Sequence, residues 1–380
     1  MRLPRRAWCP WWGAVLLAGC VSPRPLWLPD PDATDCRTGW TEIHHIGIRD
    51  GSPLKMVWND GILYFGLDEP PQIVAVDATD GAARLLAEES VQDLWVEGDQ
   101  LLYASQGDKL FALPLSGGTP RLVLDAQTAL NASIYGLPEH VELDPSYFYW
   151  DLQGQHGSPR WSWWRMPRAG GAAEMMGTAP LQPPSAIWST LNLSARGAVI
   201  SRYLAQDAGV APYFMAPSAG EPRPLAYPST PPLKSWIRME GHSATSILWS
   251  QSSYEQNSYP PSSRIMISDT TGSAADGVRP FWTGKPPRLA PGAYGTWPDG
   301  DGGWIVAGQE PLFGGELHTS VWAVDADGNG RRLGCSASDA VSVSMASAIL
   351  PDAVYVVVGF ANSLSPSYDY GIVEVDRRPR

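Results

Sequence analysis

Two short sequence patterns alternate along this chain after residue 50, and they constrain its fold more than any other feature. The first is a turn followed by an aliphatic or aromatic run. It occurs seven times, beginning at Trp58, Val96, Leu143, Leu193, Gly241, Pro298 and Leu350. The second is a similar run that ends in a turn, usually with glycine, and it also occurs seven times, from Gln72, Lys109, Trp161, Pro212, Arg264, Ser320 and Gly371. Short apolar runs bounded by turn residues indicate β-strands, so the sequence predicts an all-β fold made of repeated units.

The spacing of the repeat indicates what each unit is. Between Tyr64, Tyr103, Tyr149, Ile200, Leu248, Ile305 and Tyr355 the steps are 39, 46, 51, 48, 57 and 50 residues. Four-stranded propeller blades take about 40 to 50 residues each. We therefore expect a seven-bladed β-propeller of four-stranded antiparallel blades over residues 41–380. An open sandwich or two small β domains are the alternatives.

The last repeat has no fourth strand, because the sequence ends at Arg380 soon after the third. Thr41 to Ile48 is a β-like segment without a unit of its own. We expect this N-terminal strand to pair with the last blade and close the ring, which leaves no unpaired internal edge. Motifs such as "DGILYFG" resemble the YWTD-type and TolB-like propeller group. The resemblance implies the fold only, since the enzymatic signatures of that group are not evident.

The N-terminus has the organisation of a bacterial export signal. Arg2, Arg5 and Arg6 precede an apolar stretch at residues 7–17, which is far shorter than the roughly 20 residues that span a bilayer. The sequence "LAGC", ending at Cys20, resembles the lipobox of bacterial lipoproteins. The resemblance implies that residues 1–19 are removed, that Cys20 is acylated, and that residues 20–40 form a linker. Val21 stands where lipoproteins that enteric bacteria retain in the inner membrane have aspartate, so the resemblance favours residence in the outer membrane. A plain secretory signal peptide is the alternative.

The cysteines and the net charge indicate in which compartment the protein resides and which partners it can bind. Cys9 leaves with the signal and Cys20 carries lipid, so Cys36 and Cys335 remain, and in an oxidising periplasm we expect them to form a disulfide. Two separate thiols are the alternative. The formal net charge of −12 argues against nucleic acid as a partner. We expect a monomer that contacts the membrane through its lipid and holds no cofactor.

In a propeller whose strands are named a to d from the centre outward, the a–b and c–d turns share one face. The b–c and d–a loops share the other face, and here they are longer and more varied. Variable loops on a rigid scaffold commonly carry binding. The candidate contacts are the aromatic and ionisable residues of the b–c loops, namely Tyr254, Tyr259, Glu310, His318, Tyr368 and Tyr370.

Two motifs raise the question of a metal. "DADGNG" at 325–330 opens like a calcium loop, but position twelve is Ser336 rather than glutamate, so we expect a hairpin turn. His140, Glu142 and Asp144 alternate along one segment and could face the channel, but no second group of ligands accompanies them. The sequence therefore predicts no metal site.

Catalytic motifs are also missing. No G-x-S-x-G, H-E-x-x-H or phosphate-binding glycine loop is present, and Ser52 to Lys55 fits S-x-x-K without its partner motifs. Trp161, Trp163 and Trp164 are expected to pack between blades, with carbohydrate stacking as the alternative. The leading hypothesis is a non-enzymatic binding or scaffolding lipoprotein that presents its loop face to an envelope protein or an extracellular ligand. The alternative is a hydrolase or lyase that acts on an extracellular glycan or peptide.

Overall fold

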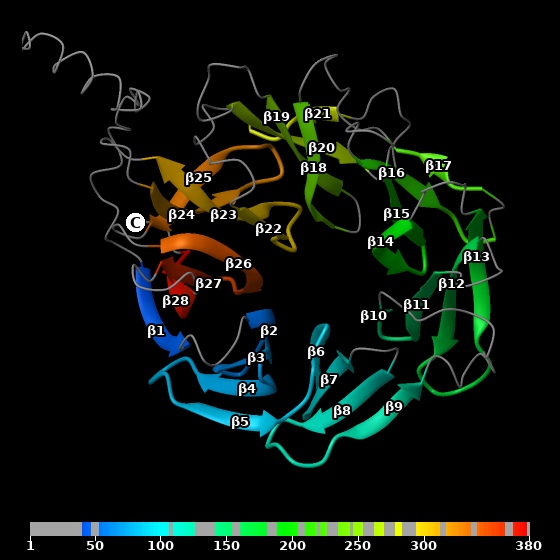
Figure 1. Ribbon diagram of the computed structural model, residues 1–380, viewed down its shortest axis with the longest axis horizontal. Helices are drawn as coiled ribbons and strands as arrows, with labels where there is room; N and C mark the ends of the chain where they lie inside the picture. The colour runs from blue at the N-terminus through cyan, green and yellow to red at the C-terminus, as the bar shows by residue number, and fades with distance from the viewer. Residues whose placement is uncertain are drawn as a thin grey trace, which may run out of the picture.

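The computed structural model is a ring of seven β-sheets, each with four strands, arranged around a centre (Figure 1). It describes residues 40–46, 53–105, 109–125, 141–153, 160–180, 188–203, 210–218, 221–225, 235–243, 246–253, 262–269, 278–282, 294–311, 317–335, 340–361 and 368–377. Every regular element in these ranges is a β-strand, and neighbouring strands within each sheet are antiparallel. The predicted seven-bladed β-propeller is therefore confirmed.

Each blade follows the chain from its innermost to its outermost strand. Blade 1 contains β2 (Pro53–Asn59), β3 (Ile62–Asp68), β4 (Pro71–Asp77) and β5 (Ala83–Ala87). Blade 2 contains β6 (Asp93–Glu97), β7 (Gln100–Ser105), β8 (Lys109–Pro114) and β9 (Arg121–Asp125). Blade 3 contains β10 (Val141–Leu143), β11 (Tyr147–Gln153), β12 (Arg160–Pro167) and β13 (Glu174–Pro180). Blade 4 contains β14 (Trp188–Ser194), β15 (Gly197–Tyr203), β16 (Val210–Met215) and β17 (Arg223–Pro224).

The remaining blades complete the ring. Blade 5 contains β18 (Ser235–His242), β19 (Ser246–Ser253), β20 (Ser262–Asp269) and β21 (Val278–Pro280). Blade 6 contains β22 (Tyr294–Pro298), β23 (Trp304–Pro311), β24 (Leu317–Val324) and β25 (Gly330–Cys335). Blade 7 contains β26 (Ala340–Ile349), β27 (Ala353–Ala361) and β28 (Tyr368–Asp376), and its fourth strand is β1 (Trp40–Ile46) from the N-terminal part of the chain.

The ring is closed by this N-terminal strand, as predicted. β1 pairs antiparallel with β28, from Trp40 opposite Val375 to Ile46 opposite Tyr370. The observed strand covers residues 40–46, slightly earlier than the segment proposed from the sequence. A hydrogen bond between His44 Nδ1 and the carbonyl oxygen of Gly81, at 3.0 Å, links the closing strand to blade 1. Closure thus brings β1 and β28, from the two ends of the described chain, together in blade 7, beside blade 1.

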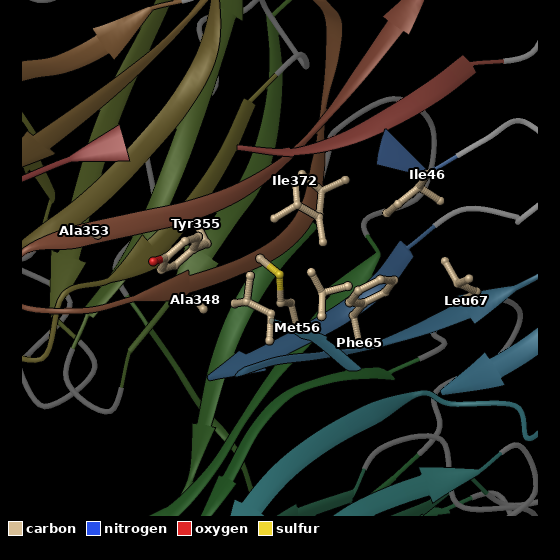
Figure 2. Close-up of a cluster of buried hydrophobic side chains, with 11 residues drawn as sticks. Ile46, Met56, Phe65, Leu67, Ala348, Ala353, Tyr355 and Ile372 are labelled. Carbon is tan, nitrogen blue, oxygen red and sulfur yellow. The ribbon is translucent and has the colours of Figure 1, made fainter. Parts of the chain in front are cut away.

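Apolar side chains fill the seams between blades. Successive residues on a strand face opposite sides of the sheet, and each blade has a neighbour on both sides, so both faces are apolar. Figure 2 shows the seam between blades 7 and 1, where Met56 and Phe65 meet Tyr355 and Ile372 beside Ile46 of the closing strand. These five side chains are at most 5% exposed. The blades are therefore held together mainly by hydrophobic burial.

The structure corrects the alignment of the repeats in two blades. The a–b turn of blade 1 is the two-residue Asp60–Gly61, with φ angles of 46° and 85°, which suits a tight hairpin. Counted from the equivalent turns, Tyr64 corresponds to Leu102 in blade 2 rather than Tyr103. The same count gives Val199 in blade 4 rather than Ile200. Tyr103 accordingly packs back against Tyr64 of the preceding blade, because a shift of one residue reverses the side that a residue faces.

Candidate functional site

Within the described residues, strands b and c of blades 5, 6 and 7 stay paired further toward the loop face than those of the other blades, and we call these hairpins the raised hairpins. Their last paired residues are Ser253 with Ser262, Pro311 with Leu317, and Ala361 with Tyr368. Counted from the equivalent positions Leu248, Ile305 and Tyr355, strand b continues for five, six and six residues. In the described residues of blades 1 to 4 it continues for three or four residues, to Asp68, Ser105, Gln153 and Tyr203. Compared with four residues, the described pairing is longer by one residue in blade 5 and by two in blades 6 and 7, which is about 3 to 7 Å of strand.

The outer strands do not follow the raised hairpins to their ends. In blade 6, β25 pairs with β24 only as far as Ser320 opposite Cys335. In blade 5, β21 pairs only with residues 266–268 of β20. Within the described ranges strand c is therefore the outer edge of both tips, while β18 pairs with β19 as far as Ser253 in blade 5 and β22 pairs with β23 as far as Gly308 in blade 6.

Two of the candidate contacts meet on the raised hairpin of blade 6. The sequence predicts Glu310 and His318 in the loop between the strands. They instead lie within β23 and β24, directly opposite each other in the ladder. The register therefore makes an acidic and an imidazole residue cross-strand neighbours. Tyr254 and Tyr259 of blade 5 lie outside the described residues.

The other two candidates lie elsewhere. Tyr368 and Tyr370 begin β28 rather than belonging to a loop. Tyr370 is half-buried opposite Ile46 and packs against the hydrophobic cluster between blades 7 and 1. The described candidates therefore lie on two blades, Glu310 and His318 on blade 6 and Tyr368 and Tyr370 on blade 7.

The calcium-like motif forms a hairpin turn, as expected. The Asp325 carboxylate accepts hydrogen bonds from the backbone N–H groups of Asp327 and Asn329, at 3.0 and 2.8 Å, and from the Asn329 side-chain amide. The Asn329 amide and the backbone donors lower the pKa of Asp325 below its ordinary value. Its oxygens therefore organise the c–d turn of blade 6.

The His140–Glu142–Asp144 segment does not assemble ligands in the described structure. His140 lies outside the described residues. Asp144 stabilises the a–b turn of blade 3. Its carboxylate accepts hydrogen bonds from the N–H groups of Ser146 and Tyr147 and from the Tyr149 hydroxyl, at 2.7 to 2.8 Å. Burial alone would raise the pKa of Asp144, but the Tyr149 hydroxyl and the two backbone donors bring it below its ordinary value. No group of three or more histidine, cysteine or acidic residues suited to a metal occurs among the described residues.

The tryptophan cluster packs between blades, as predicted. Trp161 and Trp163 are fully buried toward blade 4, and Trp164 packs against blade 2. The Trp164 indole N–H donates to the Ser162 hydroxyl at 3.0 Å, and the same arrangement joins Trp322 to Ser320 in blade 6. These rings therefore belong to the scaffold.

Sequence reasoning missed a buried carboxylate in the seam of blades 3 and 4. Asp151 is fully buried, and its Oδ2 accepts hydrogen bonds from Trp161 Nε1 at 3.0 Å and from the Thr190 hydroxyl of blade 4 at 2.5 Å. Equivalent positions in blades 1, 2 and 6 hold Gly66, Ala104 and Ala307. A charged residue where other blades have small ones was the signal in the sequence. Here a polar network links two blades that are elsewhere joined by apolar packing.

The motif that fits S-x-x-K has a structural explanation as well. Ser52 lies outside the described residues, while Lys55 on β2 forms an ion pair with Asp93 on β6 at 3.5 Å. Both residues lie near the loop-face ends of innermost strands in adjacent blades. Lys55 is therefore placed to link blades 1 and 2.

The turn face, where the a–b and c–d turns lie, is acidic. Among the described residues, the exposed charges there are mostly acidic: Asp60, Asp80, Glu97, Asp99, Glu221, Asp301, Asp325, Asp327 and Asp352, against the exposed Arg196. Two of its arginines are engaged by acidic neighbours, Arg168 by Glu97 and Arg377 by Asp299. This face would be repelled by an anionic surface.

The cysteines are only partly described. Cys335 is buried at the end of β25 and is disulfide-bonded. Cys20 and Cys36 lie outside the described residues. The described ranges contain no helix long and apolar enough to cross a membrane.

Comparison with known proteins supports the architecture. No protein-family model matches the chain, and no curated protein matches it. Solved structures do match. An oligogalacturonate lyase in complex with manganese gives a TM-score of 0.53 at 11% identity, covering 89% of this chain and 94% of that one. An oligogalacturonate lyase from Vibrio parahaemolyticus gives a TM-score of 0.52 at 10% identity, covering 93% and 96%. At these identities the likeness concerns the fold alone.

Proposed function

We propose that this chain is a lipid-anchored envelope protein that binds another envelope protein or an extracellular ligand through the raised hairpins of blades 5 to 7. The observation that carries the proposal is that strands b and c of these blades stay paired further toward the loop face than in blades 1 to 4, within the described residues. In blades 5 and 6 they also extend beyond the outer strand. Projecting segments on a rigid scaffold commonly carry recognition.

The anchor part of the proposal is supported by the resemblance of residues 17–20 to a lipobox. Acylation of Cys20 would hold the ring within a linker's length of a membrane. The acidic turn face supports the same arrangement, because it favours presenting the opposite face to an anionic surface. Mass spectrometry of the mature N-terminus tests this part. We expect a diacylglyceryl thioether on Cys20, and an unmodified Cys20 thiol would refute the anchor.

The binding part is tested by site-specific photocrosslinking in cells that express the full chain. p-Benzoylphenylalanine in place of Glu310, His318 or Tyr368 probes the raised hairpins, and the same group in place of Asp80 or Asp327 is the matched control on the turn face. We expect one discrete adduct from the hairpin positions and none from the controls. Adducts from the turn face alone, or from all positions equally, would contradict the assignment of the binding face.

A glycan lyase or hydrolase is the second candidate. It is supported by the opposed positions of Glu310 and His318, since a carboxylate and an imidazole can share acid and base roles. It is also supported by the fold likeness to two oligogalacturonate lyases. Purified full chain should be incubated with oligogalacturonate, with and without manganese, and assayed for unsaturated products. Turnover that is lost in both Glu310→Gln and His318→Ala variants would favour the enzyme, whereas absence of turnover together with position-specific crosslinks favours the binding protein.

A further inference from the structure

The large hydrophobic side chains that are exposed in the described part of the chain all occupy one position of the propeller. They are Leu85, Leu122 and Met175, which are 51%, 48% and 51% exposed. Leu85 ends a ladder row that runs outward across blade 1 from Phe65 through Val74. The corresponding rows of blades 2 and 3 end in Leu122 and Met175. Three consecutive outer strands, β5, β9 and β13, therefore carry an apolar side chain at the same height, and we call these side chains the wall residues.

The propeller fold does not require apolar side chains at this position. The corresponding rows end in Pro224 in blade 4 and in Pro280 in blade 5. Blade 6 has Arg332, whose guanidinium lies over the Trp322 ring, 4.9 Å from its centre, and blade 7 has Glu42. Since these blades have proline or a charged residue here, packing within a blade does not explain the wall residues. Apolar side chains that gather on one part of a surface indicate an interaction site.

Two exposed arginines accompany the wall residues. Arg84 of β5 extends a ladder row that packs in the seam of blades 1 and 2, and Leu122 extends a row that packs in the same seam from blade 2. Arg121 of β9 and Met175 border the seam of blades 2 and 3 in the same way. Each of these two seams therefore opens at the outside of the ring with one arginine beside one apolar side chain.

Acidic residues are sparse on this part of the wall. The connections from β8 to β9 and from β12 to β13 contain none. The exposed Glu174 accepts two hydrogen bonds from Arg165, at 2.8 and 2.9 Å, so its charge is compensated. Asp80 and Glu88 are exposed, but both belong to blade 1. Arg84 donates to two backbone carbonyl oxygens of blade 2, which leave its positive charge in place. The wall at blades 2 and 3 is thus apolar and cationic, in contrast to the acidic turn face.

The shape of the wall limits what can cover it. The outside of the ring is convex (Figure 1), so a second copy with the same wall would touch it at about one blade. Stable protein interfaces bury about 800 Å² on each partner, which such a contact does not provide. A lipid surface differs because it deforms around side chains that enter it separately, and its phosphates accept hydrogen bonds from arginine.

We propose that the outer wall of blades 1 to 3 docks on a membrane that contains anionic phospholipid. The wall residues enter the boundary between headgroups and acyl chains, while Arg84 and Arg121 reach the lipid phosphates. This inference rests on the membrane location given under the proposed function, but not on acylation of Cys20. β5, β9 and β13 lie across the ring from the raised hairpins (Figure 1), so those hairpins would remain on the side away from the bilayer.

The test is flotation with vesicles, using a chain that has no acyl anchor of its own. Cys20→Ala gives residues 18–20 the A-x-A form of an ordinary secretory cleavage site, so the mature chain begins at Val21, which mass spectrometry verifies. We expect binding to vesicles of equal parts phosphatidylglycerol and phosphatidylcholine. Binding should weaken with phosphatidylcholine alone and with added salt. Absence of binding to the anionic vesicles would overturn the proposal.

Variants at one ladder position provide both the test and its control. Leu85→Ser, Leu122→Ser and Met175→Ser should each weaken vesicle binding about five-fold, because each removes an apolar side chain that is half available to the lipid. The triple variant should bind about a hundred-fold more weakly. Pro224→Ser and Pro280→Ser, at the same position of blades 4 and 5, should bind like the parent. Equal losses in the controls, or an unchanged triple variant, would refute the assignment of the wall.

A gain of binding excludes misfolding as the cause of these effects. Leu122→Trp should tighten binding, since tryptophan favours the membrane interface, and its unfolding midpoint should match that of the parent. Analytical ultracentrifugation should show a monomer; a dimer that the triple variant abolishes would make a second copy the occupant and overturn the proposal. The anchor fails separately: an unmodified Cys20 with wall-dependent vesicle binding refutes acylation alone, and an acylated Cys20 without such binding refutes the wall alone.

Discussion

The ion pair of Asp299 and Arg377 should contribute far more to stability than a surface ion pair, because it joins two blades in a nearly buried position. Arg377 Nη2 lies 2.6 Å from Asp299 Oδ2, and its Nη1 donates to the carbonyl oxygen of Leu350 at 2.6 Å. The two side chains are only 16% and 13% exposed. Asp299 is in the a–b turn of blade 6, while Arg377 follows β28 of blade 7. The pair therefore links blade 6 to blade 7, the blade that β1 completes.

The magnitude follows from these contacts. Truncating Arg377 to alanine leaves the Asp299 carboxylate nearly buried without its cation and removes a charged hydrogen bond to Leu350. Breaking a fully buried pair costs about 3 to 5 kcal/mol, and the residual exposure here reduces that to about 2 to 4 kcal/mol. The coupling energy between Asp299 and Arg377 should be about 2 kcal/mol.

The assay is a double-mutant cycle measured by urea unfolding of the oxidised protein. The cycle uses Asp299→Ala, Arg377→Ala and the double variant. Arg165 and Glu174 provide a matched control cycle, since they also form a close ion pair, at 2.8 Å, but are 25% and 62% exposed. The control coupling should be about 0.5 kcal/mol. Equal couplings in the two cycles, or a larger one in the control, would refute the reasoning that burial at the seam determines the contribution.

Three further predictions concern single side chains. Gly330→Ala should destabilise the protein by about 1 to 3 kcal/mol in urea unfolding, because a Cβ there would lie 2.0 Å from the Trp282 ring, and a compensating Trp282→Leu should restore part of the loss. Asp144 has a lowered folded-state pKa, so its stabilising contribution is present above the ordinary pKa near 3.8 and is lost as pH falls through the lower folded value. Asp144→Asn should therefore flatten the acid limb of a stability–pH profile, and an unchanged limb would contradict the assignment. Added calcium should leave the unfolding midpoint unchanged in wild type and in Asp325→Ala, as measured by calorimetry, whereas a calcium-dependent rise in wild type alone would indicate a metal site.

The architecture could be predicted from the sequence because its physical cause is local and repeated. Each blade needs turns at regular intervals and apolar residues on both sides of its strands, and both features are visible without knowledge of contacts. The "DG" of the first a–b turn is an example, since its positive φ angles are a property of two adjacent residues. The missing fourth strand of the last blade identified the closing segment by the same reasoning.

The alignment within the blades was harder to predict, because residue type was an unreliable marker of position along the strand. The a–b turns of blades 1 and 2 both have two residues, but Tyr64 is the third residue after its turn and Tyr103 is the fourth, so the two tyrosines pack into the same seam from opposite blades. Residue type alone does not show which side of a sheet a residue faces. A shift of one residue along the strand reverses it.

The candidate site was predicted only in outline, because it depends on contacts between blades. The b–c segments were identified as long, but the sequence assigned their length to loops, whereas the structure assigns part of it to paired strands. Glu310 and His318 are eight residues apart in the chain, and only the ladder register makes them neighbours. Asp151 was overlooked because its partner Thr190 belongs to the next blade.

The polar contacts between blades are spread around the ring. Lys55 meets Asp93 between blades 1 and 2, Asp151 meets Thr190 between blades 3 and 4, and Arg377 meets Asp299 between blades 6 and 7. At the closure, His44 of β1 meets the Gly81 carbonyl beside a seam in which apolar burial carries most of the attraction. Hydrophobic contact is non-directional and tolerates sliding, whereas these charged and directional bonds fix one register. Apolar burial therefore holds the blades together, and the polar contacts determine how each blade meets the next.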